Sequence, residues 1–574
     1  MREMAARTVV VGSGCAGLNA ADWLAAMGED VLLVTENMCS GTSRNTGSDK
    51  QTYYKLSLAG DEEDSVSLMA ATLKHEDVDG DLALCEAAGS AQCFLKLAML
   101  GVPFPVNDYG EYVGYQTDHD LRRRASSAGP LTSRYMTEAL EKSVRARHVP
   151  IADHTLACRI ITGQEGVEGL LCLDTVQQDW VLIRCAHVVL CTGGPAAIYR
   201  ASVYPVSQFG MSGMAFLAGA EGENLDRWQY GLASVKFRWN VSGSYQQVMP
   251  RYVSVEEDGT EHEFLAEKLG ILDAMNMTFL KGYQWPFDEA KTEGSSRVDM
   301  LVKQENDLGR KVFMDFRRNP SGYDLFAVSE EARNYLIHCG ATQQTPIERL
   351  RAMNEPAIQL YWDHGIDLEK EMLEVQVCAQ HHNGGIAVDD TWQTCVPGLY
   401  VCGEAAGTFG AYRPGGTALN STQVGSMRAA RHIARRSRRK IPEGELEVTL
   451  PTAPKGQPAA MMVNLQQAMT KDAAFLRNEQ GIRALMTQIN ALGAEQETVS
   501  PMDPLAVQRL RLADMMVTQT QVLSAMLYDL THEGKGIMMT RDGVSCRRAA
   551  RPIPERDQWF ERVWRTYREQ EGRP

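Results

Sequence analysis

The first 36 residues contain a strand, a glycine-rich turn, a helix and a second strand in a spacing that few folds accept. Thr8-Val-Val-Val11 reads as a buried strand that runs into Gly12-x-Gly14-x-x-Gly17 and the apolar segment Leu18 to Met27. A second strand, Val31 to Val34, ends shortly before Glu36. Glycines in this pattern permit a tight turn, close approach to a pyrophosphate and helix–strand packing, while the carboxylate binds ribose hydroxyls. We therefore predict a parallel α/β sheet that binds a dinucleotide through Gly12, Gly14, Gly17 and Glu36.

A second glycine-rich stretch, from Gly384 to Ala430, lies far along the chain. Within it, Cys395 to Gly407 places a Pro-Gly turn before four apolar residues and a Gly-Glu stop, as in a short buried strand that ends at a ligand. Ala411 to Asn420 then places two glycines ahead of a helix predicted from Thr417 to Arg436. The bare backbone N–H groups and the positive end of the helix dipole suit an anion. This stretch predicts a ligand site that combines a carboxylate with a helix start.

These residues resemble the flavoprotein subunits of succinate dehydrogenase and fumarate reductase, together with the soluble fumarate reductases and L-aspartate oxidase of the same family. The matches, in family order and spacing, are Gly384-Gly385-Ile386, Val396 to Tyr400, Gly403-Glu404 and Arg413-Pro-Gly-Gly416. The N-terminal fingerprint alone does not separate FAD from NAD. The resemblance of Gly384 to Ala430 to the C-terminal part of a flavin site favours FAD, because an NAD-binding domain does not need such a segment. The resemblance implies an α/β fold: a Rossmann-like FAD-binding domain with an inserted α+β capping domain and a C-terminal helical region.

A chain of 574 residues is too long for a single core, so two or three domains are expected. We predict the FAD-binding domain in 1–234 and 376–440, the capping domain in 235–375, and a linker with a helical domain in 441–574. In the tail, one helical stripe is more typical of a core than of a cofactor contact: Leu512, Met516, Leu523, Leu527 and Leu530. The stretch Glu533 to Gly536 resembles the family's Glu-Ser-Arg-Gly.

The resemblance places the FAD cofactor against several glycine-rich segments. Glu404 would hold the ribityl chain, and the helix after Gly416 would face the N1/O2 edge of the flavin ring. Asn45 stands where membrane-bound members carry the histidine that bonds covalently to FAD, so non-covalent FAD is predicted. A plain surface loop is the alternative interpretation of the segment around Asn45. The further cofactor-binding residues predicted are Thr42, Ser43, Thr46, Gly47, Thr192, Gly193, Gly194, Gly403, Gly415, Thr417, Ala418 and Leu419.

Two arginines are candidates for catalysis by the resemblance. Arg413 would grip a substrate carboxylate, the alternative being a surface arginine in a loop. Arg297 would be the proton donor, because Ser295 to Lys303 and Gly309 to Phe316 resemble the family's Arg-Asp-Val helix and the strand that follows it. The alternative for Arg297 is a solvated side chain at a helix start.

A histidine pair supplies the remaining catalytic candidates. Gln380 to Ile386 corresponds to the family's His-Tyr-Thr-Met-Gly-Gly with one residue missing, so either His381 or His382 would bind substrate. Both could instead pack or cap. Gly231 stands where the family has a histidine that contacts one carboxylate of a dicarboxylate substrate. A dicarboxylate of succinate size would therefore lose one clamp, and the vacated volume would admit a larger substrate.

The resemblance implies an enzyme that acts on CH–CH bonds. It would move hydride between flavin N5 and the carbon β to a carboxylate or carbonyl, so the expected substrate is a small unsaturated acid or an enone, as for an ene-reductase. Only one dinucleotide fingerprint is present, so direct use of NADH is not supported, and the electron donor is either unidentified or a separate redox protein. The alternatives are an oxidase similar to L-aspartate oxidase, or an electron-transfer subunit that works with an iron–sulfur partner.

Charge and cysteine content limit the partners, metal sites and cellular compartment that we expect for this chain. The net charge of −15 argues against nucleic acid as a general partner, because phosphate binding needs a basic face. Thirteen cysteines without any C-x-x-C argue against a metal site and against internal iron–sulfur ligation. An odd count without a secretory leader predicts reduced thiols in a cytoplasmic protein. We expect no apolar run of membrane-spanning length.

Overall fold

The computed structural model describes residues 1–59, 63–74, 77–117, 120–411, 413–532, 538–540, 543–545 and 550–555. The stretch Glu533 to Gly536, which resembles a family motif, lies outside these residues.

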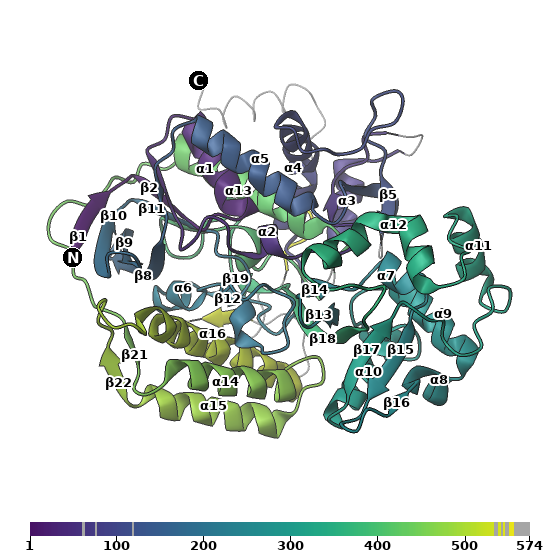
Figure 1. The fold of residues 1–574 in the computed structure, drawn as a ribbon. Helices are drawn as coiled ribbons and strands as arrows, with labels where there is room; N and C mark the ends of the chain where they lie inside the picture. Colours follow the sequence, from purple (N-terminus) through teal and green to yellow (C-terminus); the bar gives the residue numbers. More distant parts are fainter. Residues whose placement is uncertain are drawn as a thin grey trace.

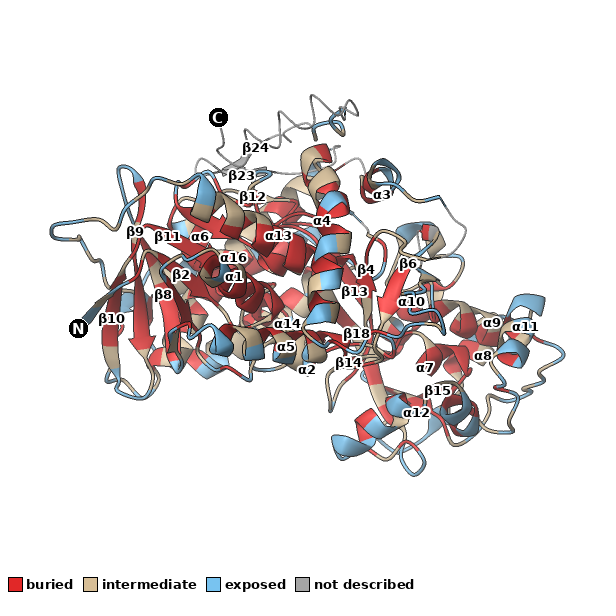
Figure 2. Ribbon diagram, turned by 90° about the horizontal axis from the view of Figure 1, so that it is seen from above, coloured by how far each residue is buried: buried red, intermediate tan, exposed pale blue. Residues whose placement is uncertain are grey.

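A five-stranded parallel sheet forms the centre of the first structural unit (Figure 1). Its order is β20–β11–β2–β3–β7, from β20 (Leu399–Val401), β11 (His187–Leu190), β2 (Thr8–Val11), β3 (Val31–Val34) and β7 (Ile151–Ala152). All residues of the first four strands are buried, as their β-branched and apolar composition predicts. Figure 2 shows β2 and β11 of this sheet in the colour of buried residues. Strand pairing thus joins residues 8–34 to residues 399–401.

Helices and a second sheet cover the parallel sheet. Helix α1 (Cys15–Ala26) packs against both α5 (Thr132–Ala146) and α13 (Thr417–Arg435), and it contacts β2, β3 and β11. A four-stranded sheet contacts β3 and β11, in the order β1 (Arg2–Ala5), β10 (Asp179–Arg184), β9 (Gly166–Asp174), β8 (Thr155–Gly163). Since α1 and α13 both begin at the carboxyl ends of sheet strands, their N-termini converge on one edge of the sheet.

We expected no apolar run of membrane-spanning length, but helix α4 (Gly80–Met99) is long and apolar enough to cross a membrane, judged by length and composition alone. In the structure half of it is buried inside the fold, against α3 (Val66–Leu73) and α13. This part of the chain thus forms two helices, α3 and α4, that pack on each other. Next to them lies a three-stranded sheet, β4 (Thr52–Tyr54), β6 (Asp120–Ser127) and β5 (Tyr115–Thr117).

The second unit, here called the cap, is built on a six-stranded sheet of order β14–β13–β18–β17–β15–β16. Two long strands, β13 (Trp228–Ser234) and β18 (Leu373–His382), pair antiparallel and connect the cap to the first unit. The predicted bounds of the cap, 235–375, stay a prediction. In the structure, β13 begins before residue 235 and β18 ends after residue 375. The other cap elements are β14 (Trp239–Asn240), α7 (Ser244–Gln247), β15 (Arg251–Val255), β16 (Glu261–His262), α8 (Phe264–Leu269), α9 (Ile271–Lys281), η2 (Glu289–Lys291), α10 (Ser296–Asp307), β17 (Lys311–Asp315), α11 (Glu330–His338) and α12 (Pro346–Asp363).

Three helices, α14 (Pro458–Asp472), α15 (Glu479–Gly493) and α16 (Ala506–Thr531), form the C-terminal helical region. Of the predicted stripe on α16, Leu512 and Leu523 are fully buried, whereas Leu530 is 42% exposed at the helix end. The remaining elements are α2 (Thr42–Asn45), η1 (Ala196–Ile198), α6 (Gly213–Leu217), β12 (Gly222–Glu223), β19 (Gly385–Ile386), η3 (Gly403–Ala405), β21 (Thr452–Pro454), β22 (Gln496–Thr498), β23 (Met538–Thr540) and β24 (Gly543–Ser545). The predicted fold class, a parallel α/β domain with an inserted α+β cap and a helical C-terminal region, is confirmed.

Candidate active site

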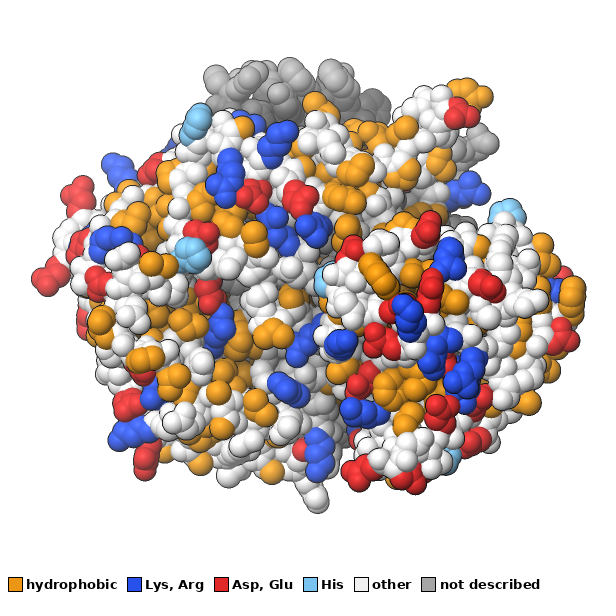
Figure 3. Space-filling model, in the orientation of Figure 1, with side chains coloured by type: hydrophobic (Ala, Val, Ile, Leu, Met, Phe, Trp, Pro, Cys, Tyr) orange, Lys and Arg blue, Asp and Glu red, His pale blue; other side chains and the backbone are white. Residues whose placement is uncertain are grey.

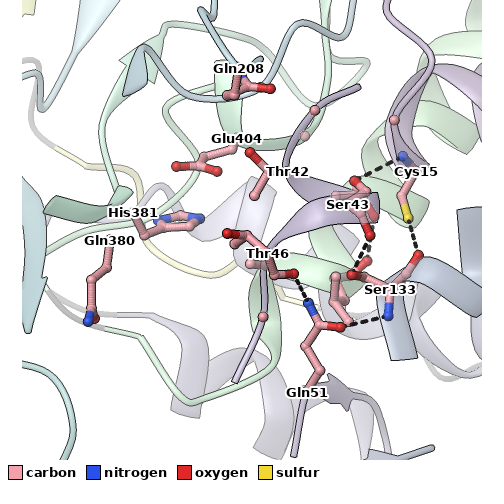
Figure 4. A pocket seen from close by; sticks show the side chains of 18 of the residues that line it. Cys15, Thr42, Ser43, Thr46, Gln51, Ser133, Gln208, Gln380, His381 and Glu404 are labelled. Atoms are coloured by element: carbon pink, nitrogen blue, oxygen red, sulfur yellow. Dashed lines mark hydrogen bonds between the residues drawn. The ribbon is translucent and has the colours of Figure 1, made fainter. Parts of the chain in front are cut away.

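One cavity of about 1430 Å³ lies at the carboxyl ends of β2, β3, β11 and β20 and reaches the cap. Ligands of open α/β sheets bind at this edge. Pockets for one small ligand measure roughly 300–1,000 Å³, so this cavity has room for a cofactor and a substrate together. Figure 4 shows Cys15 and Ser43 on one side of it and Gln380, His381 and Glu404 on the other.

The turn after β2 has the geometry that the fingerprint predicts. Gly12 has φ +107°, and a Cβ there would lie 2.4 Å from the carbonyl oxygen of Cys191. A Cβ on Gly17 would lie 1.8 Å from the carbonyl oxygen of Gly12, so Gly17 serves close packing and does not line the cavity. Gly14 lines the cavity, and the Cys15 N–H at the start of α1 donates to Ser43 Oγ (3.2 Å). The start of α1 therefore lies in the cavity wall, at a position that suits a diphosphate.

Glu36 lines the cavity at the end of β3. Its Oε1 accepts from Nη2 of Arg511 (2.6 Å), a residue of α16, and the Arg511 guanidinium lies 4.6 Å from the centre of the Phe209 ring. The helical region thus orients the carboxylate that is predicted to bind ribose. No motif in the sequence pointed to Arg511.

The loop around α2 is held in place by hydrogen bonds that Figure 4 draws. Ser133 Oγ donates to the Ser43 carbonyl (2.6 Å), and Gln51 Nε2 donates to the Thr46 carbonyl (3.0 Å). Thr42, Ser43, Thr46 and Gly47 line the cavity. Asn45 does not: it is exposed, and its Nδ2 donates to the carbonyls of Cys39 and Gly41 (both 3.0 Å), so it ties the loop to itself.

The segment after β11 adds a second wall. Thr192 and Gly193 line the cavity, and Gln208 Nε2 donates to the Thr192 carbonyl (2.6 Å) and to the Gly194 carbonyl (3.1 Å). The hydroxyl oxygens of Thr42 and Thr192 are buried without a partner among the described residues. Buried hydroxyls are nearly always hydrogen-bonded, so these two point to a polar ligand.

Glu404 lies in the cavity at the end of β20. Its Oε1 accepts from the backbone N–H of His382 (2.9 Å) and from the Tyr204 hydroxyl. Burial raises the pKa of Glu404 to about 7. A Cβ on Gly194 would lie 2.4 Å from this carboxylate, which explains the glycine there although Gly194 does not line the cavity.

Helix α13 begins at the cavity wall. Gly416 has φ +92°, and a Cβ there would lie 2.6 Å from Thr52 Cγ2. Thr417 is buried, and its hydroxyl donates to the Pro414 carbonyl (2.9 Å) instead of facing the cavity. The residues of this turn that line the cavity are Gly415, Gly416, Ala418 and Leu419.

Arg413 reaches the cavity from the loop before α13. Its Nη2 donates to Gln229 Oε1 (3.0 Å) and its Nη1 to Thr417 Oγ1 (3.3 Å), while Nε is buried without a partner. Within the described residues no carboxylate forms an ion pair with this guanidinium. Burial lowers the pKa of Arg413 to about 10, so the group stays cationic at neutral pH. The geometry excludes the alternative of a surface arginine.

Of the two candidate histidines, His381 lines the cavity and His382 does not. His381 Nδ1 lies 2.9 Å from Asn383 Oδ1, and Asn383 Nδ2 donates to the Gly410 carbonyl, so Nδ1 carries the proton. Its Nε2 is buried without a partner in the described part of the chain and presents a lone pair. Burial, and then the charge of Arg413, lower the pKa of His381 well below its usual value. His382 instead stacks on Trp228 with ring centres 4.1 Å apart.

Gln380 occupies the space expected to be empty beside Gly231. A β-bulge between Gln229 and Tyr230 shifts the register of β13 against β18 and leaves Gln380 unpaired in the ladder. A Cβ on Gly231 would lie 2.8 Å from Gln380 Nε2, so the prediction of a vacated volume is wrong. Gln380 lines the cavity, and its amide nitrogen is buried without a partner among the described residues. Its position directly before the histidine pair was the one sequence signal for this residue.

Arg297 is not brought to the cavity. It lies in the first turn of α10, its side chain is 41% exposed, and Nη1 pairs with Glu293 on the preceding segment (3.1 Å). Helix and strand were placed correctly by the resemblance, but this position of the helix faces solvent. The prediction of Arg297 as proton donor is therefore not carried forward.

A buried carboxylate lies behind the start of α13. Glu86 of α4 is 3% exposed, and burial raises its pKa to about 7. Between its ordinary pKa of 4.5 and about 7 the unfolded chain loses this proton while the folded chain keeps it, so the free energy of unfolding falls as pH rises. We expect Glu86→Gln to stabilise the protein at pH 8 by on the order of 3 kcal/mol, and by much less at pH 5.

Thermal or denaturant unfolding at both pH values measures this difference. The matched control is Glu355→Gln at an exposed position of α12, which should shift stability little at either pH. An equal effect of Glu86→Gln at pH 5 and pH 8 would rule out titration of the buried carboxyl.

The residues present fit an extended dinucleotide. The glycine turn and the α1 N-terminus suit a diphosphate, Glu36 suits a ribose, and two unpartnered threonine hydroxyls line the same channel. Beyond Glu404, the cavity continues to Arg413, Gln380 and His381 under the cap. Among the described residues no group of three or more His, Cys, Asp or Glu side chains is arranged to hold a metal ion.

Comparisons with known proteins agree with this layout. A family model described as "FAD binding domain" matches residues 7–419. An L-aspartate oxidase of Agrobacterium fabrum is 27% identical over 437 residues, which cover 75% of this chain and 74% of the relative. A fumarate reductase (CoM/CoB) polypeptide of Methanothermobacter marburgensis is 24% identical, covering 72% of this chain and 71% of the relative. A solved structure of a mutant of E. coli quinol fumarate reductase FrdA superposes with a TM-score of 0.70 at 17% identity, covering 98% of this chain and 99% of that chain.

Proposed function

This chain belongs to the FAD-binding flavoprotein family of succinate dehydrogenase, fumarate reductase and L-aspartate oxidase, and from that premise we propose a reaction for it. It is an FAD-dependent oxidoreductase. The proposed reaction reduces, or forms, a C=C bond next to a carboxylate or carbonyl group. The observation that carries the proposal is the convergence of three groups, Arg413, Gln380 and His381, at the end of the cofactor channel under the cap.

The residues that would hold FAD are those of the channel. Backbone groups at the starts of α1 and α13 would hold the diphosphate and the pyrimidine edge of the ring, Glu36 the ribose and Glu404 the ribityl chain. Asn45 cannot form a covalent link and faces away, so the proposed binding is non-covalent. When bound, the flavin accepts or gives the hydride.

Arg413 is proposed to bind the group that activates the double bond. Its guanidinium is oriented by Gln229 and Thr417 and makes no ion pair with a described carboxylate, so a substrate carboxylate or carbonyl can accept from the fork. Negative charge that develops on that group during reaction would be stabilised by a cation already in place.

His381 is proposed to carry the proton in place of Arg297. His381 lines the cavity, and its Nε2 has no hydrogen-bond partner among the described residues, so this nitrogen can accept a proton as the double bond forms, or return it in the opposite direction. After burial, the second cause of its low pKa is the charge of Arg413. An anion bound to Arg413 would offset that charge and so raise the pKa of His381, while burial, the larger cause, would remain.

The proposed substrate is a monocarboxylate or an enone. The cations that line the described cavity are Arg413 and the exposed Lys50, and the position of the family's second clamp holds the neutral amide of Gln380. A second carboxylate would be buried next to an amide and a neutral imidazole, which costs more than burying a carbonyl. Aromatic cap residues Trp285 and Tyr335 add apolar wall to the same space.

The decisive experiment follows re-oxidation of the reduced flavin without oxygen. A panel of α,β-unsaturated monocarboxylates and enones is compared with fumarate, using reduced viologen as donor. We expect one class of the panel to turn over at about 1 per second or faster, and fumarate at least about 100-fold more slowly. Fumarate as the best substrate would contradict the assignment of Gln380, and no turnover with any C=C substrate would contradict the proposed reaction.

Similarity to L-aspartate oxidases supports a second candidate, an oxidase whose flavin is re-oxidised by oxygen. Oxygen uptake with L-aspartate distinguishes it from a reductase. L-Aspartate is itself a dicarboxylate. Arg413 would bind one of its carboxylates, and the second would be buried next to the neutral side chains of Gln380 and His381, which disfavours this substrate as it disfavours fumarate. The Methanothermobacter relative is one component of a fumarate reductase, which supports a third candidate, a polypeptide that exchanges electrons with a partner protein.

A further inference from the structure

A second cavity of about 480 Å³ lies where the first unit, the cap and the helical region meet. Its wall comes from residues 199–202 after η1, from β13 and β18, from α10 of the cap and from α14 of the helical region. Figure 3 shows basic side chains gathering where the helical region meets the cap. This cavity shares no lining residue with the first.

The charge of this second cavity is positive in an acidic chain. Four cations line it, Arg200, Arg238, Lys303 and Lys471, against one carboxylate, Asp307. Asp307 already pairs with Lys303 on α10. Four cations less one carboxylate leave three positive charges. In the described part of the chain, no carboxylate pairs with any of the other three cations.

Arg238 is the best fixed of these cations. Its Nη1 donates to the Tyr204 carbonyl (2.9 Å), which leaves the other guanidinium nitrogens for the cavity. Burial, and to a smaller extent the nearby Arg200, lower the pKa of Arg238. Two guanidinium groups that face one space repel each other unless an anion lies between them.

The walls around these cations are rigid. The Tyr199 hydroxyl donates to the Ala473 carbonyl (2.8 Å) and lies 2.9 Å from the Tyr230 hydroxyl, which fixes two aromatic walls. The backbone N–H groups of Arg200 and Ala201 both donate to Thr470 Oγ1 (2.9 and 3.1 Å). These two hydrogen bonds join the segment after η1 to α14 and so place the backbone of Arg200 next to that of Lys471, the neighbour of Thr470.

We propose that this cavity binds a small multivalent anion that carries two or more phosphate or carboxylate groups. Arg238 and Arg200 would each bind one anionic group through the guanidinium fork, and Lys471 would contribute a point charge. The cavity volume lies within the usual range for small ligands, and its aromatic walls accept the carbon skeleton of such a molecule. Neither the flavin nor the substrate of the proposed reaction takes part, so the site stands whether or not that reaction is correct.

The test is calorimetric titration of the FAD-loaded protein at constant ionic strength. Pyrophosphate and citrate serve as separate probes for phosphate and carboxylate recognition, and loaded FAD keeps the diphosphate position of the first cavity occupied. The variant is Arg200→Gln with Lys471→Gln, since neither side chain pairs with a carboxylate of the described residues and the fold should be kept. The control is Lys142→Gln with Lys455→Gln, two exposed cations elsewhere that remove the same charge.

We expect saturable binding of one probe per chain, at least about 10-fold weaker in the double variant and within about twofold of wild type in the control. The tighter probe identifies the chemical source of the anion. Absence of binding by either probe up to about 1 mM would overturn the proposal. Equal weakening in the variant and the control would overturn it too, because general electrostatics would then account for binding.

Discussion

Replacing Arg413 with lysine is expected to lower kcat/KM by about 10²- to 10³-fold while flavin content stays unchanged. Lysine keeps the charge but loses the planar fork that Gln229 and Thr417 orient. The loss should fall on both KM and kcat, because the same contact binds the activating group and stabilises the charge that develops on it. Steady-state kinetics with the best substrate of the panel, and the flavin absorbance of the purified protein, measure the two parts of this prediction.

The same substitution at Arg297 is the matched control. Arg297 is partly exposed and pairs with Glu293 in the same stretch of chain, so Arg297→Lys should leave kcat/KM within about twofold of wild type. If instead Arg297→Lys abolished turnover and Arg413→Lys did not, the cap would have to supply the catalytic arginine. The roles assigned to Arg413 and His381 would then be wrong.

A Gly12→Ala protein is expected to be purified nearly free of flavin, with FAD affinity reduced at least about 100-fold. The new Cβ would lie 2.4 Å from the Cys191 carbonyl oxygen, and φ +107° disfavours any L side chain. Relief of the clash moves β2 away from β11 or shifts the start of α1, and both changes displace the backbone groups that would face the diphosphate. The ratio of flavin to protein absorbance measures the loss. Flavin released by heating wild-type protein also tests the non-covalent linkage.

Gly28→Ala provides the comparison for backbone strain alone. Gly28 also has positive φ, +79°, but open space surrounds the position of its missing Cβ. Its substitution should cost about 1 kcal/mol of stability and leave flavin content unchanged. A soluble Gly12→Ala protein with the flavin content of wild type would show that the turn after β2 does not contact the cofactor.

The parts of the site that could be predicted from sequence depend on local chemistry. The glycines at 12, 14 and 17 must be glycine because backbone atoms approach where side chains would be, and such constraints leave a fixed spacing in the sequence. Gly403, Glu404 and the start of α13 obey the same rule at the end of β20. These segments meet because parallel strands end at one sheet edge, a geometric rule that needs no side-chain detail.

The parts that could not be predicted depend on pairing between distant strands. Gln380 fills the space beside Gly231 because β13 and β18 shift register by one residue, and nothing in either strand alone shows where a bulge falls. The Tyr204–Glu404 and Arg511–Glu36 contacts likewise join residues 200 and 475 positions apart. The start of α10 was predicted correctly, but the direction of Arg297 depends on how the cap packs on the first unit.

The strand order β20–β11–β2–β3–β7 has a consequence for synthesis of the chain on the ribosome. Strand β11 is complete at residue 190, but its outer neighbour β20 ends only at residue 401. At a translation rate of about 5–20 residues per second, the outer edge of β11 waits roughly 10–40 s for its partner. During that interval His187-Val-Val-Leu190 presents unpaired backbone groups and an apolar face. The nascent chain therefore exposes an edge that can pair with another chain, at the place where the cofactor channel later forms.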